Sequence, residues 1–104
     1  MHTATDIAYE IPDTTVGRMR GLLFRDGLPR GRVMVFKNCR LIHTAGMRFA
    51  LDVFFVDKKG GVVKIVRGVK PGRIVFGGFR ARHTVEAEAG WLPEDAVFDP
   101  KIFQ

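Results

Sequence analysis

Residues 42–57 read IHTAGMRFALDVFFVD, and this stretch decides the fold. Its second half, residues 51–57 (LDVFFVD), is apolar at both odd and even positions, which is typical of a strand covered on both faces. The next four residues, KKGG at 58–61, have turn-forming composition and precede a second apolar run at 62–69. We therefore predict a buried β-hairpin that the chain enters through a polar cluster.

Shorter strands are predicted on either side of this hairpin. Residues 5–11 (TDIAYEI) alternate between apolar and polar side chains, and residues 32–36 (RVMVF) and 74–76 (IVF) are rich in β-forming side chains. Residues 83–89 (HTVEAEA) also alternate. That alternation predicts Val85 and Ala87 facing the core, with Glu86 and Glu88 facing water.

One helical segment is predicted near the N-terminus. Pro12 ends the first strand, Asp13 or Thr14 can cap a helix, and the apolar residues that follow share one helical face: Val16, Met19, Leu22 and Leu23. Together with the strands this predicts an α+β fold, in which a mostly antiparallel, twisted sheet curls toward a small barrel. No repeat or linker divides the sequence, so residues 1–104 are expected to form a single domain.

The composition is that of a globular protein. The chain has 104 residues, of which 46% are hydrophobic, enough for one core. No run approaches the ~20 apolar residues that cross a bilayer. The N-terminus lacks a basic region followed by an apolar one, so we expect no signal peptide and a cytoplasmic location. A single cysteine, Cys39, excludes an intrachain disulfide.

Charge is unevenly distributed along a chain of net charge +6. Residues 58–82 contain eight basic side chains and no acid: Lys58, Lys59, Lys64, Arg67, Lys70, Arg73, Arg80 and Arg82. Residues 83–104 contain five acids and only Lys101 as a base. The basic block can attract a polyanion, or the two blocks can complement each other within the fold. No nucleic-acid motif accompanies the charge, which makes nucleic acid the less favoured partner.

Several spaced motifs together resemble one family. They are RMRGLLFRDGL at 18–28, VMVF at 33–36, HTAGMRFALDVFFVD at 43–57, VVKIV at 62–66 and VEAEAG at 85–90. In this order they resemble the domain-of-unknown-function 192 family (DUF192, also called UPF0127), over residues 17–90. Ala50 stands where members often have Pro, Leu23 where Met is usual, and the tail lacks the Gly-Asp turn typical of the family's end. The resemblance implies a small, mostly β fold and no established reaction, substrate or cofactor.

Cys39 and His43 are candidates for a nucleophile and its base. Four residues span about 13 Å along a strand, too far for a hydrogen bond, but about 6 Å on a helical turn. The intervening residues 40–42 favour extended structure. A small hydrolase or transferase using Cys39 and His43 is therefore an alternative function only, and we predict no metal site and no cofactor. His83 shares its strand parity with Val85, which predicts a hydrogen-bonded residue at the core edge.

Asp52 is the most unusual residue, because it interrupts an otherwise apolar strand. A buried carboxylate requires a cationic or hydrogen-bonding partner, and Arg18, Arg25 and Arg48 are the candidates. One interpretation is a structural ion pair or a cap at the entry of the strand. The functional interpretation is a polar pocket formed by His43, Arg48 and Asp52 with Arg25 and Arg18.

We therefore predict a binding or accessory module whose polar pocket accepts an anionic small molecule or peptide. A second alternative is polyanion binding through the basic block. Gly77-Gly78 resembles a phosphate loop only loosely and is discounted. Phe76 and Phe79, which flank it, are expected to pack in the core rather than to dock a partner.

Overall fold

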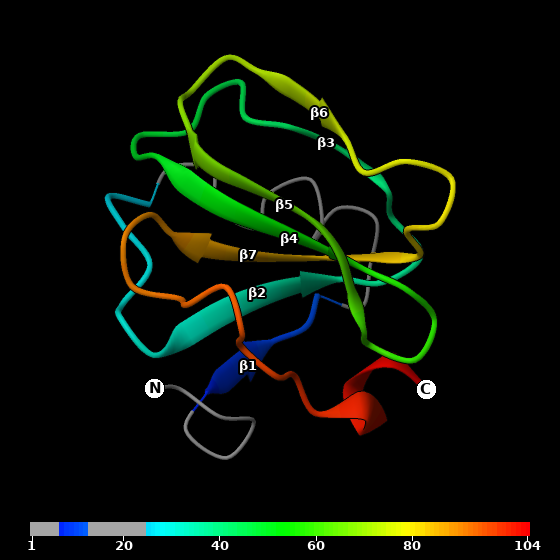
Figure 1. Ribbon diagram of the computed structural model, residues 1–104. Helices are drawn as coiled ribbons and strands as arrows, with labels where there is room; N and C mark the ends of the chain where they lie inside the picture. The colour runs from blue at the N-terminus through cyan, green and yellow to red at the C-terminus, as the bar shows by residue number, and fades with distance from the viewer. Residues whose placement is uncertain (1–6, 13–24) are drawn as a thin grey trace.

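The computed structural model describes residues 7–12 and 25–104, and these residues are almost entirely β structure (Figure 1). The described elements are β1 (Ala8–Glu10), β2 (Arg32–Phe36), β3 (Leu41–His43), β4 (Leu51–Val56), β5 (Val62–Val69), β6 (Ile74–Phe76), β7 (His83–Glu88) and the 3-10 turn η1 (Pro100–Phe103). Figure 1 shows β3 and β6 at the top of the view, β1 and η1 at the bottom, and β5, β4, β7 and β2 between them.

The strands form two sheets. The larger has the order β1-β2-β7-β4-β5, in which β1 runs parallel to β2 and the other neighbours are antiparallel. The smaller is an antiparallel ribbon of β3 and β6, in which Leu41 pairs with Phe76 and His43 with Ile74. Strands distant in sequence are thus neighbours, because β7 inserts between β2 and β4.

The predicted central hairpin is confirmed as β4 and β5. All six residues of β4 are buried, as its apolar sequence indicated. The hairpin turn is fixed by Asp57, whose Oδ1 accepts the backbone N–H groups of Lys59 and Gly61 at 2.9 Å each. These bonds hold the pKa of Asp57 below its ordinary value, and the bond from Gly61 contributes more than the bond from Lys59.

Two apolar clusters cover the opposite faces of the large sheet. The first joins alternate residues of β2, β4 and β7 to the C-terminal segment, and its members include Val33, Val35, Phe54, Val56, Val85, Ala87, Leu92, Phe98 and Phe103. The second joins the other parity to the ribbon and nearby loops, and its members include Leu28, Met34, Phe36, Ile42, Leu51, Val53, Phe55 and Val69. The sheet is therefore the middle layer of the fold.

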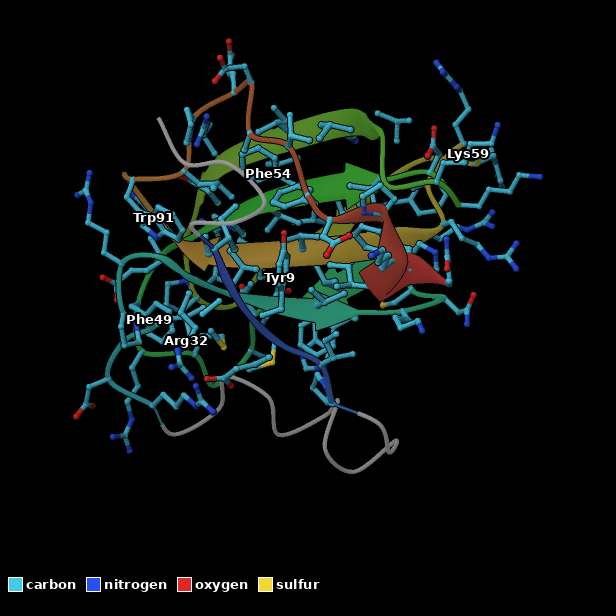
Figure 2. The ribbon with its side chains drawn as sticks, turned by 90° about the horizontal axis from the view of Figure 1, so that it is seen from below. Tyr9, Arg32, Phe49, Phe54, Lys59 and Trp91 are labelled. Carbon is cyan, nitrogen blue, oxygen red and sulfur yellow. The ribbon has the colours of Figure 1, made fainter. Side chains whose placement is uncertain are left out.

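Contacts from β1 help to hold the C-terminal segment on the first face. Tyr9 points from β1 toward that segment in Figure 2, and its hydroxyl accepts the backbone N–H of Asp99 at 2.9 Å. Partial burial raises the pKa of Tyr9 above its ordinary value. Phe54 packs edge-to-face on Phe98, with ring centroids 5.8 Å apart. The tail thus forms one wall of the core.

The prediction of an α+β fold with a barrel-like sheet is wrong. Residues 7–12 and 25–104 contain seven strands in two sheets, and η1 is the only helical element among them. The large sheet is open, since β1 pairs only with β2 and β5 only with β4. Covering layers on both faces, rather than closure, bury its apolar residues. The helix predicted after Pro12 lies outside the described residues.

The predicted orientation of β7 is right for Val85 and Ala87, which lie in the core, and wrong for its polar face. The alternation at 83–89 suggested a polar face toward water, yet Thr84 and Glu86 are buried together with Val85 and Ala87. The reason is topological, because β7 occupies the centre of a sheet that is covered on both sides. Glu86 is consequently only 4% exposed.

Candidate functional site

Asp52, at the start of β4, lies inside the protein and is hydrogen-bonded by donors of the chain itself. The residue is 2% exposed, and its carboxylate accepts three hydrogen bonds from the described part of the chain. Arg67 Nη1 donates to Oδ2 at 2.9 Å, the backbone N–H of Gly68 to Oδ1 at 2.9 Å, and that of Gly90 to Oδ2 at 3.0 Å. Arg67 also donates to the Leu92 carbonyl at 2.6 Å. Asp52 thereby ties β4 to β5 and to the corner after β7.

Two of the three arginines predicted as partners of Asp52, Arg25 and Arg48, bind other carboxylates, so the prediction is wrong for them. Arg25 forms two hydrogen bonds with Glu10, at 3.2 and 2.9 Å, and Arg48 binds the exposed carboxylate of Asp26 at 3.1 Å. The Arg25 bond is the main reason that the pKa of Glu10 is lowered. Arg18 lies outside the described residues.

The correct partner of Asp52 could have been found from the hairpin. Leu51 pairs with Val69, which places residues 67 and 68 beside Asp52. Counting back from the KKGG turn would have brought this part of β5 close to Asp52, but the two register shifts in the ladder make such counting inexact. Arg67 lies C-terminal to β4, whereas the three predicted partners all lie N-terminal to it.

His43 ends β3, and Cys39 lies two residues before that strand begins. His43 is exposed on β3, and the Cys39 thiol donates to the Leu41 carbonyl at 3.2 Å. Extended structure is the geometry in which a spacing of four residues is too long for a Cys–His hydrogen bond. Within residues 7–12 and 25–104, no three His, Cys, Asp or Glu side chains form a group that could hold a metal. The pocket of His43, Arg48 and Asp52 stays a prediction. The carboxylate of Asp52 already accepts hydrogen bonds from Arg67, Gly68 and Gly90.

Glu86 was missed by the sequence analysis. It lies on the ribbon-facing side of β7, between Met34 of β2 and Val53 of β4 in register. Burial in this apolar setting raises its pKa to about 8, so that it carries a proton at neutral pH. Only the position of β7 in the middle of the sheet reveals this, because the VEAEA sequence itself is that of a half-exposed strand.

His83 is a buried, hydrogen-bonded residue at the core edge, as predicted. Its Nδ1 accepts the backbone N–H of Asn38 at 2.9 Å, and its ring stacks on Phe103 with centroids 5.0 Å apart. Burial lowers the pKa of His83, and the nearby charges of Arg82 and Lys37 lower it further. These contacts join the turn after β2 to η1, so the role of His83 is structural.

Large apolar side chains gather on the outer face of the β3–β6 ribbon. Because side chains alternate along a strand, Ile42 and Val75 pack inward while Leu41, His43, Ile74 and Phe76 face outward. Phe79 adds to this face, since its ring packs against that of Phe76 with the ring centroids 5.4 Å apart. We call these five outward residues, Leu41, His43, Ile74, Phe76 and Phe79, the ribbon surface.

The ribbon surface is strongly exposed. Phe79 is 86% exposed and Ile74 77%, so the prediction that Phe76 and Phe79 pack in the core is wrong. The pattern of the ribbon explains this, because its inward residues already fill the space against the sheet. A contiguous exposed apolar patch on a protein marks an interaction site.

Four basic residues adjoin the ribbon surface along the chain or by a hydrogen bond, and we call them the basic rim: Arg40, Lys64, Arg73 and Arg80. Arg40 lies at one end of the ribbon, where its carbonyl accepts the N–H of Gly77, and Arg73 lies at the other. Lys64 Nζ donates to the Phe76 carbonyl at 2.8 Å, and Arg80 follows Phe79. The ion pairs found in the described part of the chain use Arg25, Arg32, Arg48 and Arg67, and none uses the rim.

Comparison with known families gives a clear assignment. The model of the DUF192 family, described as "Uncharacterized ACR, COG1430", matches residues 1–98. The chain belongs to the DUF192 family. This confirms the resemblance drawn from the motifs and extends it at both ends. No curated protein matches this DUF192 chain.

Two solved structures share the DUF192 chain's fold. One is a protein of unknown function from Novosphingobium aromaticivorans DSM 12444, with a TM-score of 0.71, 20% identity, and coverage of 81% of this chain and 64% of that one. This chain thus spans less than two thirds of that protein's length. The other, from Sinorhizobium meliloti 1021, is named as a candidate transcription regulator. It has a TM-score of 0.71, 19% identity, and coverage of 79% and 68%, respectively.

Membrane-spanning helices were also sought. None of the residues that the structure describes forms a helix with the length and apolar character that a bilayer crossing requires.

Proposed function

We propose that this DUF192 protein is a non-catalytic binding module that docks an anionic partner on the ribbon surface. The observation that carries the proposal is the exposure of Leu41, Ile74, Phe76 and Phe79 together, on a ribbon bordered by cations. Covering exposed apolar side chains with a partner removes them from water and lowers the free energy of the complex. The ribbon surface is therefore the part of the described chain best suited to recognition.

Charge selects the type of partner. Residues 37–51 and 58–85, which supply both ribbon strands and the segments directly flanking them, contain no Asp or Glu. A second copy of the chain placed face to face on the ribbon surface would bring two basic rims together, and like charges repel. An anionic partner instead gains electrostatic attraction where it also covers the apolar side chains.

The polyanion-binding alternative placed the anionic partner on the basic block at residues 58–82, whereas here the partner binds at the ribbon surface. The basic block at residues 58–82 contributes through Lys64, Arg73 and Arg80, whereas Arg67 is committed to Asp52. The small-anion pocket at His43, Arg48 and Asp52 stays a separate prediction, as does a cytoplasmic location. His43 belongs to both candidate sites, because it lies on the ribbon surface.

Heparin affinity chromatography tests the charge part of this proposal. The double variant Arg73→Gln/Arg80→Gln removes two rim charges, and Arg30→Gln/Lys101→Gln removes two exposed charges outside the ribbon. Both doubles lower the net charge equally, so a difference between them reports location. We expect the rim double to elute at clearly lower salt than the control double. Equal elution of the two doubles would refute docking on the ribbon surface.

A further inference from the structure

The ribbon surface projects apolar side chains outward from the outermost layer of the fold. Ile74 and Phe79 are 77% and 86% exposed, and Phe79 directly follows Gly77-Gly78. A folded protein partner must offer pockets of matching shape for such side chains. A lipid bilayer does not, because its interfacial region accepts apolar side chains of any shape.

The chemistry of the surface also separates lipid from nucleic acid. Single-stranded nucleic acid is held by aromatic faces on which bases stack. Leu41 and Ile74 have no aromatic face, and the rings of Phe76 and Phe79 meet at 76°, edge to face. Two rings at this angle cannot present parallel faces to successive bases. The mixture of aliphatic and aromatic side chains is that of interfacial insertion.

The basic rim completes the arrangement. Long Arg and Lys side chains keep their charged ends in water while their stems follow apolar surface. Placed around inserted Ile and Phe side chains, they lie at the depth of lipid phosphates. Each such cation near an anionic membrane surface strengthens binding about fivefold at physiological ionic strength. Insertion and charge together supply the two contributions that stable peripheral binding requires.

We infer that the anionic partner is the surface of a bilayer rich in anionic lipids, into which Ile74, Phe76 and Phe79 insert. This inference rests on the proposed docking role of the ribbon surface. Lys64, Arg73 and Arg80 contact the headgroups, and the large sheet remains above the membrane. The binding is peripheral.

Vesicle co-sedimentation tests the inference. The full chain is mixed with vesicles of equal parts phosphatidylglycerol and phosphatidylcholine, or of phosphatidylcholine alone. We expect binding to the anionic vesicles only. Phe79→Ser should weaken it about tenfold. Val97→Ser is the matched control, since Val97 is an apolar residue 63% exposed outside the ribbon, and it should change binding less than twofold.

Insertion has a direct readout. A Phe79→Trp variant should show fluorescence quenched by brominated lipids in anionic vesicles, while a Val97→Trp variant shows no more quenching than the natural chain with Trp91 alone. Because Phe79 and Val97 are both largely exposed, neither substitution should change the melting temperature. Equal quenching of the two variants would contradict the inferred orientation.

The outcomes separate this inference from the proposal beneath it. If the rim double loses heparin retention but anionic vesicles do not bind, the lipid inference fails and docking of an anionic partner stands. If a dT20 oligonucleotide or poly-glutamate binds in a Phe79-dependent way and vesicles do not, the partner is a nucleic acid or an acidic protein. If neither heparin nor vesicles distinguish rim from control variants, both ideas fail.

Discussion

The carboxylate of Asp52 accepts the backbone N–H of Gly90 at 3.0 Å, across 38 residues of sequence. Gly90 has a φ of +106° and Gly68, the second backbone donor, a φ of +61°. Residues with a Cβ rarely adopt such angles, so glycine is what allows both N–H groups to point at one carboxylate. Asp52 thus closes the end of the sheet opposite the hairpin turn, and Figure 2 shows Trp91 and Lys59 at these two ends.

Replacing Asp52 should destabilise the fold. Asp52→Asn keeps the shape of the side chain, but its amide NH2 group would face N–H donors that now bind a carboxylate oxygen. We expect the free energy of unfolding to fall by about 2–4 kcal/mol. Arg67 is partly exposed, so the two backbone bonds should account for most of the loss. Urea unfolding measures this. Asp95→Asn, an exposed control, should stay within about 0.5 kcal/mol, and a similarly small effect at Asp52 would contradict the structural role.

Glu86 should make stability fall as pH rises. Its pKa is about 8 in the folded protein against 4.5 for an unperturbed carboxyl. Between these values the folded state holds a proton that the unfolded state has lost. Its stabilising contribution is complete below pH 4.5, declines by up to about 1.4 kcal/mol per pH unit above it, and is lost once pH passes 8.

Glu86→Gln isolates this effect, because glutamine has a similar shape and no titratable proton. Urea unfolding from pH 5 to 9 should show a slope for the natural chain that the variant lacks, with the variant the more stable at pH 9. His83 has a lowered pKa and therefore acts in the opposite direction, losing stability as pH falls below 6.5. The difference between the two proteins removes that contribution. Parallel pH profiles would show that Glu86 ionises normally.

Gly77 should not tolerate a side chain. A Cβ at this position would overlap the ring of Phe55, which is fully buried. We expect Gly77→Ala to lower the free energy of unfolding by about 1–3 kcal/mol. Gly61→Ala is the control, because its Cβ would meet only the carboxylate of Asp57, at 3.1 Å. Thermal melts of both variants measure the difference, and equal melting temperatures would mean that the ribbon can move away from the sheet.

The Cys39–His43 alternative has a direct test. Because β3 is extended up to His43 and the Cys39 thiol donates to the Leu41 carbonyl, His43 should not influence the thiol. We expect His43→Ala to leave the rate of Cys39 alkylation by iodoacetamide unchanged within twofold. Asn38→Ala is a control for altered access, since Asn38 lies next to Cys39 in the chain. A severalfold slower reaction in His43→Ala alone would restore the pair as a catalytic candidate.

Local patterns predicted much of the β structure. The hairpin of β4 and β5, the strands β2 and β6, and the burial of both faces of β4 followed from apolar runs and turn residues. The anomaly at Asp52 was also visible in sequence, because a carboxylate within an apolar strand needs donors wherever the strand lies. These conclusions hold without knowing strand order, since they depend on side-chain type and spacing alone.

Pairing between distant strands decided the rest. The alternation of residues 83–88 cannot show that β7 lies between β2 and β4, and this position alone buries Glu86. Similarly, the sequence around Gly77 predicts that its aromatic residues pack in the core. Only the tertiary structure shows that Ile42 and Val75 already occupy the space between the ribbon and the sheet.

The sequence by itself determined most of the strands, the central hairpin, the family, and the need of Asp52 for partners. Only the tertiary structure decided that Arg67, Gly68 and Gly90 are those partners, that Glu86 is buried, and that Phe79 is exposed. The reason is physical. Side-chain periodicity records which face of an element is apolar, whereas burial depends on which layers cover that face, and those layers come from distant parts of the chain.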